Sequence, residues 1–229
     1  MVMDGVIFDL FGTIIPRPDR VVHEAMMRDL SSVAGVDRKI FTDAWMATYR
    51  ERITSFGTDT DSSMELLLHH LGLPPEHEVV ASMTGIWYDM TQSHFRFFDD
   101  VLPAFRDLRR SGLRVGLLTN CGPNVPDIIR RSEVGGCLDS ATYSTMEGIA
   151  KPDTSIYLRA CTRLGTEPIR TLFIGDGDNR ELYGARNAGL TAVKIDRGRI
   201  AGDYRILDDE MWDPTIGHLR DIAEFVQDI

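Results

Sequence analysis

The sequence predicts an α/β fold, in which helices cover both faces of a doubly wound parallel sheet. Short apolar runs typical of buried strands alternate with segments of helical periodicity over much of the chain. One gap interrupts this alternation. About 100 residues separate the run ending at Phe8 from the next, which begins at Leu113, and a crossover between parallel strands needs only a dozen or so. The excess predicts a domain inserted between the first two strands.

The first predicted strand is the apolar run Val6-Ile7-Phe8, which ends on Asp9. A carboxylate at the end of a buried strand is unfavourable unless another group compensates it. Gly12 and Thr13 follow, so the backbone is expected to turn there. Because ligands of open α/β sheets bind beyond the carboxyl ends of the strands, Asp9 is a candidate for chemistry, with helix capping as the alternative.

The inserted segment is expected to be helical. Helices are predicted at about 20–33, 37–52, 62–71 and 76–91, and the segment contains no convincing strand. We therefore assign residues 16–96 to a helical cap and residues 1–15 and 97–229 to the core. Because the cap leaves the sheet directly after Asp9, it is expected to overhang the carboxyl edge, where a lid would lie.

The rest of the core is expected to complete a Rossmann-like parallel sheet. Further strands are predicted at 113–118, 140–144, 171–174 and 191–195. Helices are predicted at 99–110, 124–132, 154–164, 181–188 and 214–226.

Composition narrows the possible functions. The net charge is −10 and the basic residues form no long run, which argues against nucleic-acid binding. A small anionic ligand remains possible, because a local site can be positive on an acidic protein. The three cysteines are widely spaced, so we expect neither disulfides nor a C-x-x-C metal site, and a cytoplasmic setting. No signal peptide or membrane span is expected, and both a monomer and a homodimer fit the sequence.

Four polar groups follow strands or loops at the carboxyl edge of the predicted sheet. They are Asp9, the pair Thr119-Asn120, Lys151 and Asp176. Each alone is compatible with a cap, a turn or a solvated loop, but four together at one edge are harder to explain in that way. Two carboxylates near one point call for a cation, and oxygen ligands favour Mg²⁺. In phosphoryl transfer, Lys151 and Thr119 would hold phosphoryl oxygens and Asp9 would attack phosphorus.

The order and spacing of four motifs support this prediction. They are residues 9–13, 117–120, 147–153 and 174–189. With these motifs the chain resembles the haloacid dehalogenase superfamily, in the group with a helical cap between the first two core segments. The resemblance covers nearly the whole chain. It implies a hydrolase that uses Mg²⁺ and acts on a small phosphorylated substrate.

The resemblance assigns roles by position. Asp9 is implied to be the nucleophile, Thr119 to bind the transferring phosphoryl group, and Lys151 to neutralise charge. These are the expected catalytic residues. The expected substrate contacts are Thr13, Asn120 and Arg17.

The same resemblance implies a metal site. The expected Mg²⁺ ligands are Asp9, the backbone carbonyl of Phe11, Asp176 and Glu181. Asp178 is an additional acid in the loop after Asp176, and we expect it to lie in a solvated turn.

Phe11 departs from the pattern of the family's phosphatases. They carry a second Asp at this position, which protonates the leaving group and then activates water. Phe11 still offers a carbonyl, but its side chain cannot transfer a proton, and a lost general acid or base is worth roughly 10²–10⁴-fold in rate.

Three functions therefore remain open. The first is a Mg²⁺-dependent phosphatase that acts on a good leaving group, such as an acyl phosphate, or takes its acid from the cap, where His23 and Glu24 are candidates. The second is a 2-haloacid dehalogenase; these enzymes carry an aromatic residue at the Phe11 position but need no metal and lack the fourth-motif acid. The third is a phosphate-binding module without activity. The retained Asp9 and Asp176 favour the phosphatase.

Overall fold

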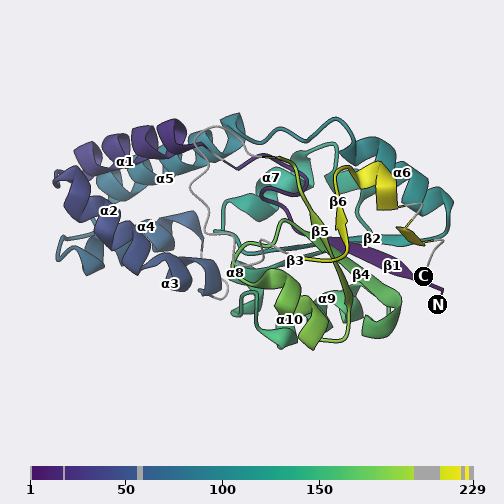
Figure 1. Ribbon diagram of the computed structural model, residues 1–229. Helices are drawn as coiled ribbons and strands as arrows, with labels where there is room; N and C mark the ends of the chain where they lie inside the picture. Colours follow the sequence, from purple (N-terminus) through teal and green to yellow (C-terminus); the bar gives the residue numbers. More distant parts are fainter. Residues whose placement is uncertain (1, 18, 56–58, 199–211, 223–224, 227–229) are drawn as a thin grey trace.

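The computed structural model describes residues 2–17, 19–55, 59–198, 212–222 and 225–226. Their architecture is a parallel sheet layered between helices, with five further helices gathered at one end of the molecule (Figure 1). Six strands form the sheet in the order β3-β2-β1-β4-β5-β6, and every neighbouring pair is parallel. The predicted α/β fold with a doubly wound parallel sheet is confirmed.

Five of the six strands fall close to the predicted positions, and the sixth lies where a helix was predicted. The strands are β1 (Gly5–Phe8), β2 (Arg114–Thr119), β3 (Ser140–Tyr143), β4 (Thr171–Gly175), β5 (Thr191–Ile195) and β6 (Thr215–Ile216). The central strand β1 is buried along its whole length, which explains its continuous apolar run. Phe8 pairs with Leu117 of β2 and with Ile174 of β4, so these three strands end at nearly the same level.

Side chains of β1 alternate between two hydrophobic cores. Val6 and Phe8 join α6 (Val101–Arg110) and α7 (Val125–Arg131) on one face of the sheet. Ile7 joins α9 (Thr154–Leu164) and α10 (Glu181–Asn187) on the other face. This alternation is the expected period of two for a strand covered on both faces. A short helix, α8 (Ser144–Glu147), follows β3 and was not predicted.

The prediction of a helix over 214–226 is wrong at its start. Residues Thr215–Ile216 form the edge strand β6, and a 3-10 helix follows at Leu219–Asp221. The backbone N–H groups of Lys194 and Asp196 donate to the carbonyls of Pro214 and Ile216, at 3.0 and 2.9 Å. Pairing with β5 and burial of Leu219 therefore outweigh the helical pattern.

The segment between β1 and α6 is helical and has its own hydrophobic core. Its helices are α1 (Arg20–Ala34), α2 (Arg38–Ala47), α3 (Tyr49–Thr54), α4 (Thr60–His70) and α5 (His77–Ser93). We call residues 20–93 the five-helix segment. Its buried cluster contains Leu30, Phe41 and Trp87 and is separate from the two sheet cores. Among the described residues, no helix has both the length and the apolar character to cross a membrane.

One predicted helix in this segment, at 37–52, is instead two. Thr48 ends α2 and precedes α3, and its hydroxyl donates to the carbonyl of Ala44 at 2.8 Å. The buried guanidinium of Arg52 donates to Thr48 Oγ1 and, at 2.7 Å, to the carbonyl of Trp45. These contacts stabilise the break, which gives α3 a direction of its own and brings it beside α8 (Figure 1).

Candidate active site

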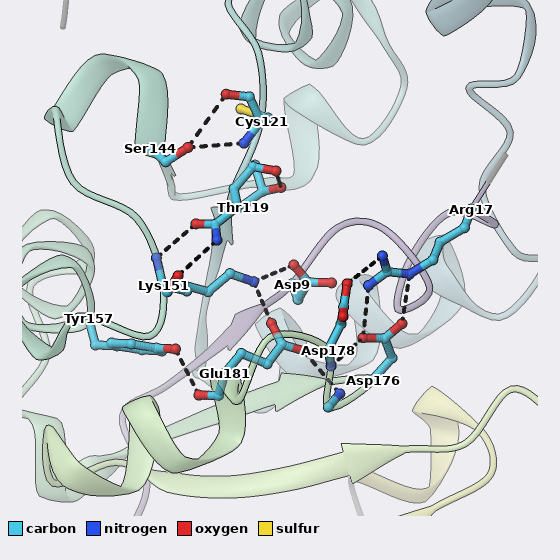
Figure 2. Close-up of polar contacts among 12 residues, drawn as sticks. Asp9, Arg17, Thr119, Cys121, Ser144, Lys151, Tyr157, Asp176, Asp178 and Glu181 are labelled. Atoms are coloured by element: carbon cyan, nitrogen blue, oxygen red, sulfur yellow. Dashed lines mark hydrogen bonds and ion pairs between the residues drawn. The ribbon is translucent and has the colours of Figure 1, made fainter. Parts of the chain in front are cut away.

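Charged side chains from separate parts of the chain meet at the carboxyl edge of the sheet (Figure 2). Asp9 directly follows β1, and its backbone N–H donates to the carbonyl of Ile174 at 2.8 Å, which extends the strand pairing by one residue. Asp176 directly follows β4, and Glu181 begins α10. Lys151 lies in the loop before α9. The order of the central strands thus brings together four residues that the sequence singled out.

Lys151 lies between two carboxylates. Its Nζ is 2.5 Å from Asp9 Oδ1 and 2.5 Å from Glu181 Oε2, and all three side chains are buried. Burial alone would favour the neutral amine, but the carboxylates of Asp9 and Glu181 outweigh it and raise the pKa of Lys151. The ammonium therefore stays charged at neutral pH.

The carboxylates of the site outnumber its cations. Burial raises the pKa of Asp9 despite the ion pair with Lys151, and the neighbouring Asp176 adds to the rise. Burial and the nearby Asp9 likewise hold the pKa of Glu181 well above its usual value. Asp9 Oδ2 is buried and has no hydrogen-bond partner within the described residues. A further positive charge would relieve this excess of negative charge.

Three of the acids lie close enough together to bind one metal ion. Asp9, Asp176 and Glu181 each offer one oxygen, and these oxygens lie within 4.8 Å of one another. Hard oxygen donors of this kind fit Mg²⁺. Gly12 permits the arrangement, because a Cβ there would lie 1.9 Å from Asp176 Oδ2 and its φ of +83° suits glycine.

Arg17 contacts the acids of the site. Its Nε is 3.1 Å from Asp176 Oδ2 and its Nη1 is 2.6 Å from Asp178 Oδ2 (Figure 2). The expectation that Asp178 lies in a solvated turn is wrong, since its side chain is only 18% exposed and is paired with Arg17. The contact of Arg17 with this loop could not be predicted from the sequence, because the two positions are far apart in the chain.

Asn120 fixes the loop that carries Lys151. Its Nδ2 donates to the Lys151 carbonyl at 3.0 Å, and its Oδ1 accepts from the Lys151 N–H at 2.8 Å. The adjacent Thr119 is fully buried, and its hydroxyl makes a long contact, 3.4 Å, with the carbonyl of Asn120. Asn120 therefore has a visible positioning role besides its place in the pocket.

A small cavity of about 60 Å³ lies against Asp9. The described residues that line it are Asp9, Phe11, Arg17, Tyr49, Asn120, Lys151, Asp178, Asn179 and Glu181. Thr13 is not among them; it is fully buried, and its carbonyl accepts from Arg197. The cap candidates His23 and Glu24 do not line the cavity either, and Glu24 pairs with Arg20 at the surface.

Tyr49 is a site residue that the sequence did not single out. Of the described residues lining the cavity, it is the one that comes from the five-helix segment. Its side chain is 39% exposed, yet desolvation and the nearby Asp178 carboxylate raise the pKa of Tyr49. The phenol therefore remains protonated at neutral pH. Its position depends on the break between α2 and α3, which no periodicity in the sequence indicated.

The fold and the site define an α/β protein with a buried carboxylate at the end of its central strand. A model of the haloacid dehalogenase-like hydrolases matches residues 3–189. The chain belongs to this family, and the resemblance found in the sequence is confirmed.

Relatives of the chain include both phosphatases and dehalogenases. A glyceraldehyde 3-phosphate phosphatase of Methanopyrus kandleri is 25% identical over 229 residues, covering 98% of this chain and 97% of the relative. An (S)-2-haloacid dehalogenase of Pseudomonas fluorescens is 24% identical over 205 residues, covering 88% of each chain. The crystal structure of a 2-haloacid dehalogenase from Pseudomonas syringae pv. Tomato DC3000 matches with a TM-score of 0.74 at 20% identity, over 99% of both chains. The similarity to this crystal structure shows the shared fold and does not distinguish a phosphatase from a dehalogenase.

Proposed function

We propose that this hydrolase is a Mg²⁺-dependent phosphatase that acts on a small phosphorylated metabolite. The observation that carries the proposal is the buried cluster of Asp9, Asp176 and Glu181, whose oxygens lie within 4.8 Å of one another. A buried cluster of like charges needs a cation, and a metal ion is the simplest one. The phosphatase relative from Methanopyrus kandleri supports the same choice.

In the proposed reaction, Asp9 attacks phosphorus and an aspartyl-phosphate forms as the bond to the leaving oxygen breaks. Oδ2 of Asp9 suits this role, because Oδ1 is bound to Lys151 and Oδ2 has no partner in the part of the chain that the structure describes. Lys151 and Thr119 would contact the phosphoryl oxygens. Bound Mg²⁺, held by Asp9, Asp176, Glu181 and the Phe11 carbonyl, would neutralise their charge.

Tyr49 supplies the proton in this proposal. Phe11 cannot protonate the leaving oxygen, and Lys151 is held by two carboxylates. Tyr49 lines the same cavity as Asp9 and carries a neutral O–H group. It would donate its proton to the leaving oxygen, and the tyrosinate would then take a proton from the water that attacks phosphorus. The products are an alcohol and phosphate.

The five-helix segment would serve as the cap over this site, with residues 16–96 as the inserted unit. Its contribution of Tyr49 and its separate hydrophobic core support that role. Closing the cap would exclude water while the aspartyl-phosphate forms. Three free cysteines are consistent with the expected cytoplasmic setting.

A dehalogenase is the second candidate, and Phe11 is the observation that favours it. A halide leaving group needs no proton, so an aromatic residue at this position would be no disadvantage. Against it, the carboxylate of a 2-haloacid would approach the four acids Asp9, Asp176, Asp178 and Glu181, with two cations and no metal ion to offset them. In the phosphatase, Mg²⁺ would offset the charge of both the acids and the substrate, so the phosphatase fits the charges better.

A substrate screen tests the choice. Phosphate esters, acetyl phosphate and 2-haloacids would each be incubated with Mg²⁺ and with EDTA. We expect phosphate release that requires Mg²⁺, loss of that release in Asp9→Asn, and unchanged release in the control Asp43→Asn, whose carboxylate is exposed on α2. Halide release in EDTA would contradict the phosphatase and favour the dehalogenase.

A further inference from the structure

A second cavity lies beside the site, between the five-helix segment and the core. It is lined by residues of α5 and of the chain that follows β2, among them Trp87, Met90, Thr91, Gly122 and Asn124. Phe11 lines this cavity and also the small cavity at Asp9. The mainly apolar space therefore adjoins the cavity that contains the reacting carboxylate.

One polar group in this wall has an unused acceptor. Asn124 is 3% exposed, and its Nδ2 donates to Thr91 Oγ1 at 2.8 Å. The Thr91 hydroxyl donates in turn to the Trp87 carbonyl at 2.8 Å, so Thr91 must accept from Asn124 and the orientation of the amide is fixed. Asn124 Oδ1 is then left buried, with no partner among the described residues.

Asn124 does not use its side chain as a helix cap. It occupies the N-cap position of α7, where asparagine usually accepts from the backbone, but makes no such hydrogen bond. An unsatisfied buried acceptor is unfavourable. A ligand with a hydroxyl or N–H donor would satisfy it.

The size of the cavity limits what it can hold. Its volume is about 150 Å³. An apolar cavity of roughly this volume holds a benzene molecule, so a group of about six non-hydrogen atoms fits. Gly122 keeps the space open at the Trp87 side, because a Cβ there would lie 2.5 Å from the Trp87 ring and 3.1 Å from Asn124 Oδ1.

We propose that this cavity binds the leaving group of the substrate, and that the leaving group is a compact, mainly apolar moiety of about six non-hydrogen atoms with one hydrogen-bond donor for Asn124 Oδ1. The inference rests on the proposed phosphatase function. Phe11 lacks the carboxylate that transfers a proton in the family's phosphatases, and it would instead provide apolar surface for the leaving group.

The first test compares matched substrates. These are cyclohexyl phosphate, its 3- and 4-hydroxy derivatives, and acetyl phosphate, whose leaving group is small. We expect the enzyme to prefer one hydroxylated ring by roughly tenfold in kcat/KM, the effect of one hydrogen bond. Asn124→Leu should abolish that preference, and Gly122→Ala should lower the ratio of ring substrates to acetyl phosphate.

Matched control substitutions distinguish these effects from a general loss of folding or activity. Asn187→Leu replaces an exposed asparagine, and Gly136→Ala adds a Cβ where no atom lies within 4 Å. Both should keep the ratios of the unmodified enzyme. If acetyl phosphate is hydrolysed but neither variant at Asn124 or Gly122 changes any ratio, the cavity does not bind the leaving group.

A binding measurement makes the inference independent of turnover. Cyclohexanol and the cyclohexane-1,3- and 1,4-diols would be titrated while tryptophan fluorescence is followed, since Trp87 lines the cavity. We expect one diol to bind more tightly than cyclohexanol, and Asn124→Leu to remove the difference. Such binding without turnover of any phosphate would uphold the cavity and contradict the phosphatase. Failure of every alcohol to change the fluorescence, in an active enzyme, would overturn the inference.

Discussion

At the scale of single residues, Lys151 holds the acidic site together. It pairs with Asp9 and with Glu181 at 2.5 Å each, in a buried environment. Breaking a buried ion pair by removing one partner is unfavourable by about 3–5 kcal/mol, because the remaining charge stays uncompensated. Lys151 therefore affects both the stability of the site and the charge of the Asp9 carboxylate.

Lys151→Met should lower turnover of acetyl phosphate by at least about 10²-fold, because the phosphoryl oxygens lose a charged contact. Thermal unfolding of the metal-free variant should also begin at a lower temperature. Lys39→Met is the matched control, since Lys39 is exposed on α2 and pairs with Asp43 at the surface. A Lys151→Met variant with normal turnover would remove Lys151 from the mechanism.

Variants of Tyr49 and Phe11 test which residue donates the proton to the leaving oxygen. Tyr49→Phe should slow hydrolysis of alkyl phosphates by roughly 10²-fold or more, whereas acetyl phosphate, with a good leaving group, should be much less affected. Phe11→Asp should restore part of the alkyl phosphate hydrolysis in the Tyr49→Phe background, because it places a carboxyl group at the position of the missing acid. Steady-state kinetics of the two single variants and the double variant measure these effects.

The control for this pair is Tyr88→Phe, which removes a phenol hydroxyl from α5 rather than from the site. It should leave both substrates unaffected. Equal losses for alkyl and acetyl phosphates in Tyr49→Phe would mean that Tyr49 shapes the pocket and does not transfer a proton.

At the scale of secondary-structure elements, Asp100 connects three parts of the core. It is the N-cap residue of α6, and its Oδ2 accepts from Arg197 Nη1 at 2.7 Å and from the Leu219 N–H at 2.9 Å. Arg197 also donates to the carbonyl of Thr13. Asp100 thereby ties α6 and the chain after β6 to the turn behind Asp9.

This connection should respond to acid. Burial favours the neutral form of Asp100, but hydrogen bonds from Arg197 and Leu219 outweigh it and lower the pKa of Asp100. An acid with a lowered folded-state pKa stabilises the fold above its unfolded pKa, about 3.8, and loses that stabilisation as pH falls through the folded value.

The unmodified protein should therefore be more stable than Asp100→Asn by about 1.5–3 kcal/mol above roughly pH 5. The difference should shrink below about pH 4. Denaturant unfolding of both proteins across this range measures it. A difference that stays constant down to pH 3 would show that the Asp100 carboxylate does not carry this stabilisation.

The elements also show what the sequence could predict. The sequence predicted β1, β2 and β4 from apolar runs that end on Asp, Thr or Gly, because strands buried on both faces are mainly apolar. It also predicted where helix α9 begins and ends. The family motifs then brought Asp9, Lys151 and Asp176 to one edge. Contacts made by particular side chains, and pairing between separate parts of the chain, were not predictable. Pairing with β5 made residues 215–216 a strand, and Arg52 stabilised the break that positions Tyr49.

At the scale of the whole molecule, the site lies where two separately packed bodies meet. The five-helix segment has its own core, the sheet has two, and Tyr49 and Trp87 are contributed from the helical side to the two cavities at the boundary. The buried acids destabilise the metal-free protein. A cation that binds them should stabilise the folded state as a whole.

Mg²⁺ should therefore raise the thermal unfolding midpoint, with a stabilisation of about 2.7 kcal/mol at a concentration 100 times its Kd. Asp176→Asn should abolish most of this shift, because one ligand is lost, whereas Asp43→Asn should retain it. Thermal scans with Mg²⁺ and with EDTA give the comparison. An equal midpoint in both conditions would argue against a metal site at these acids.

In the proposed reaction, water attacks phosphorus of an aspartyl-phosphate and not the carboxyl carbon of Asp9. A single turnover in ¹⁸O-labelled water separates the two routes by mass spectrometry. With Mg²⁺ and acetyl phosphate, the label should appear in the released phosphate while the peptide containing Asp9 stays unlabelled. Label in the Asp9 carboxylate, accompanied by halide release from a 2-haloacid in EDTA, would contradict the proposed reaction and identify a dehalogenase.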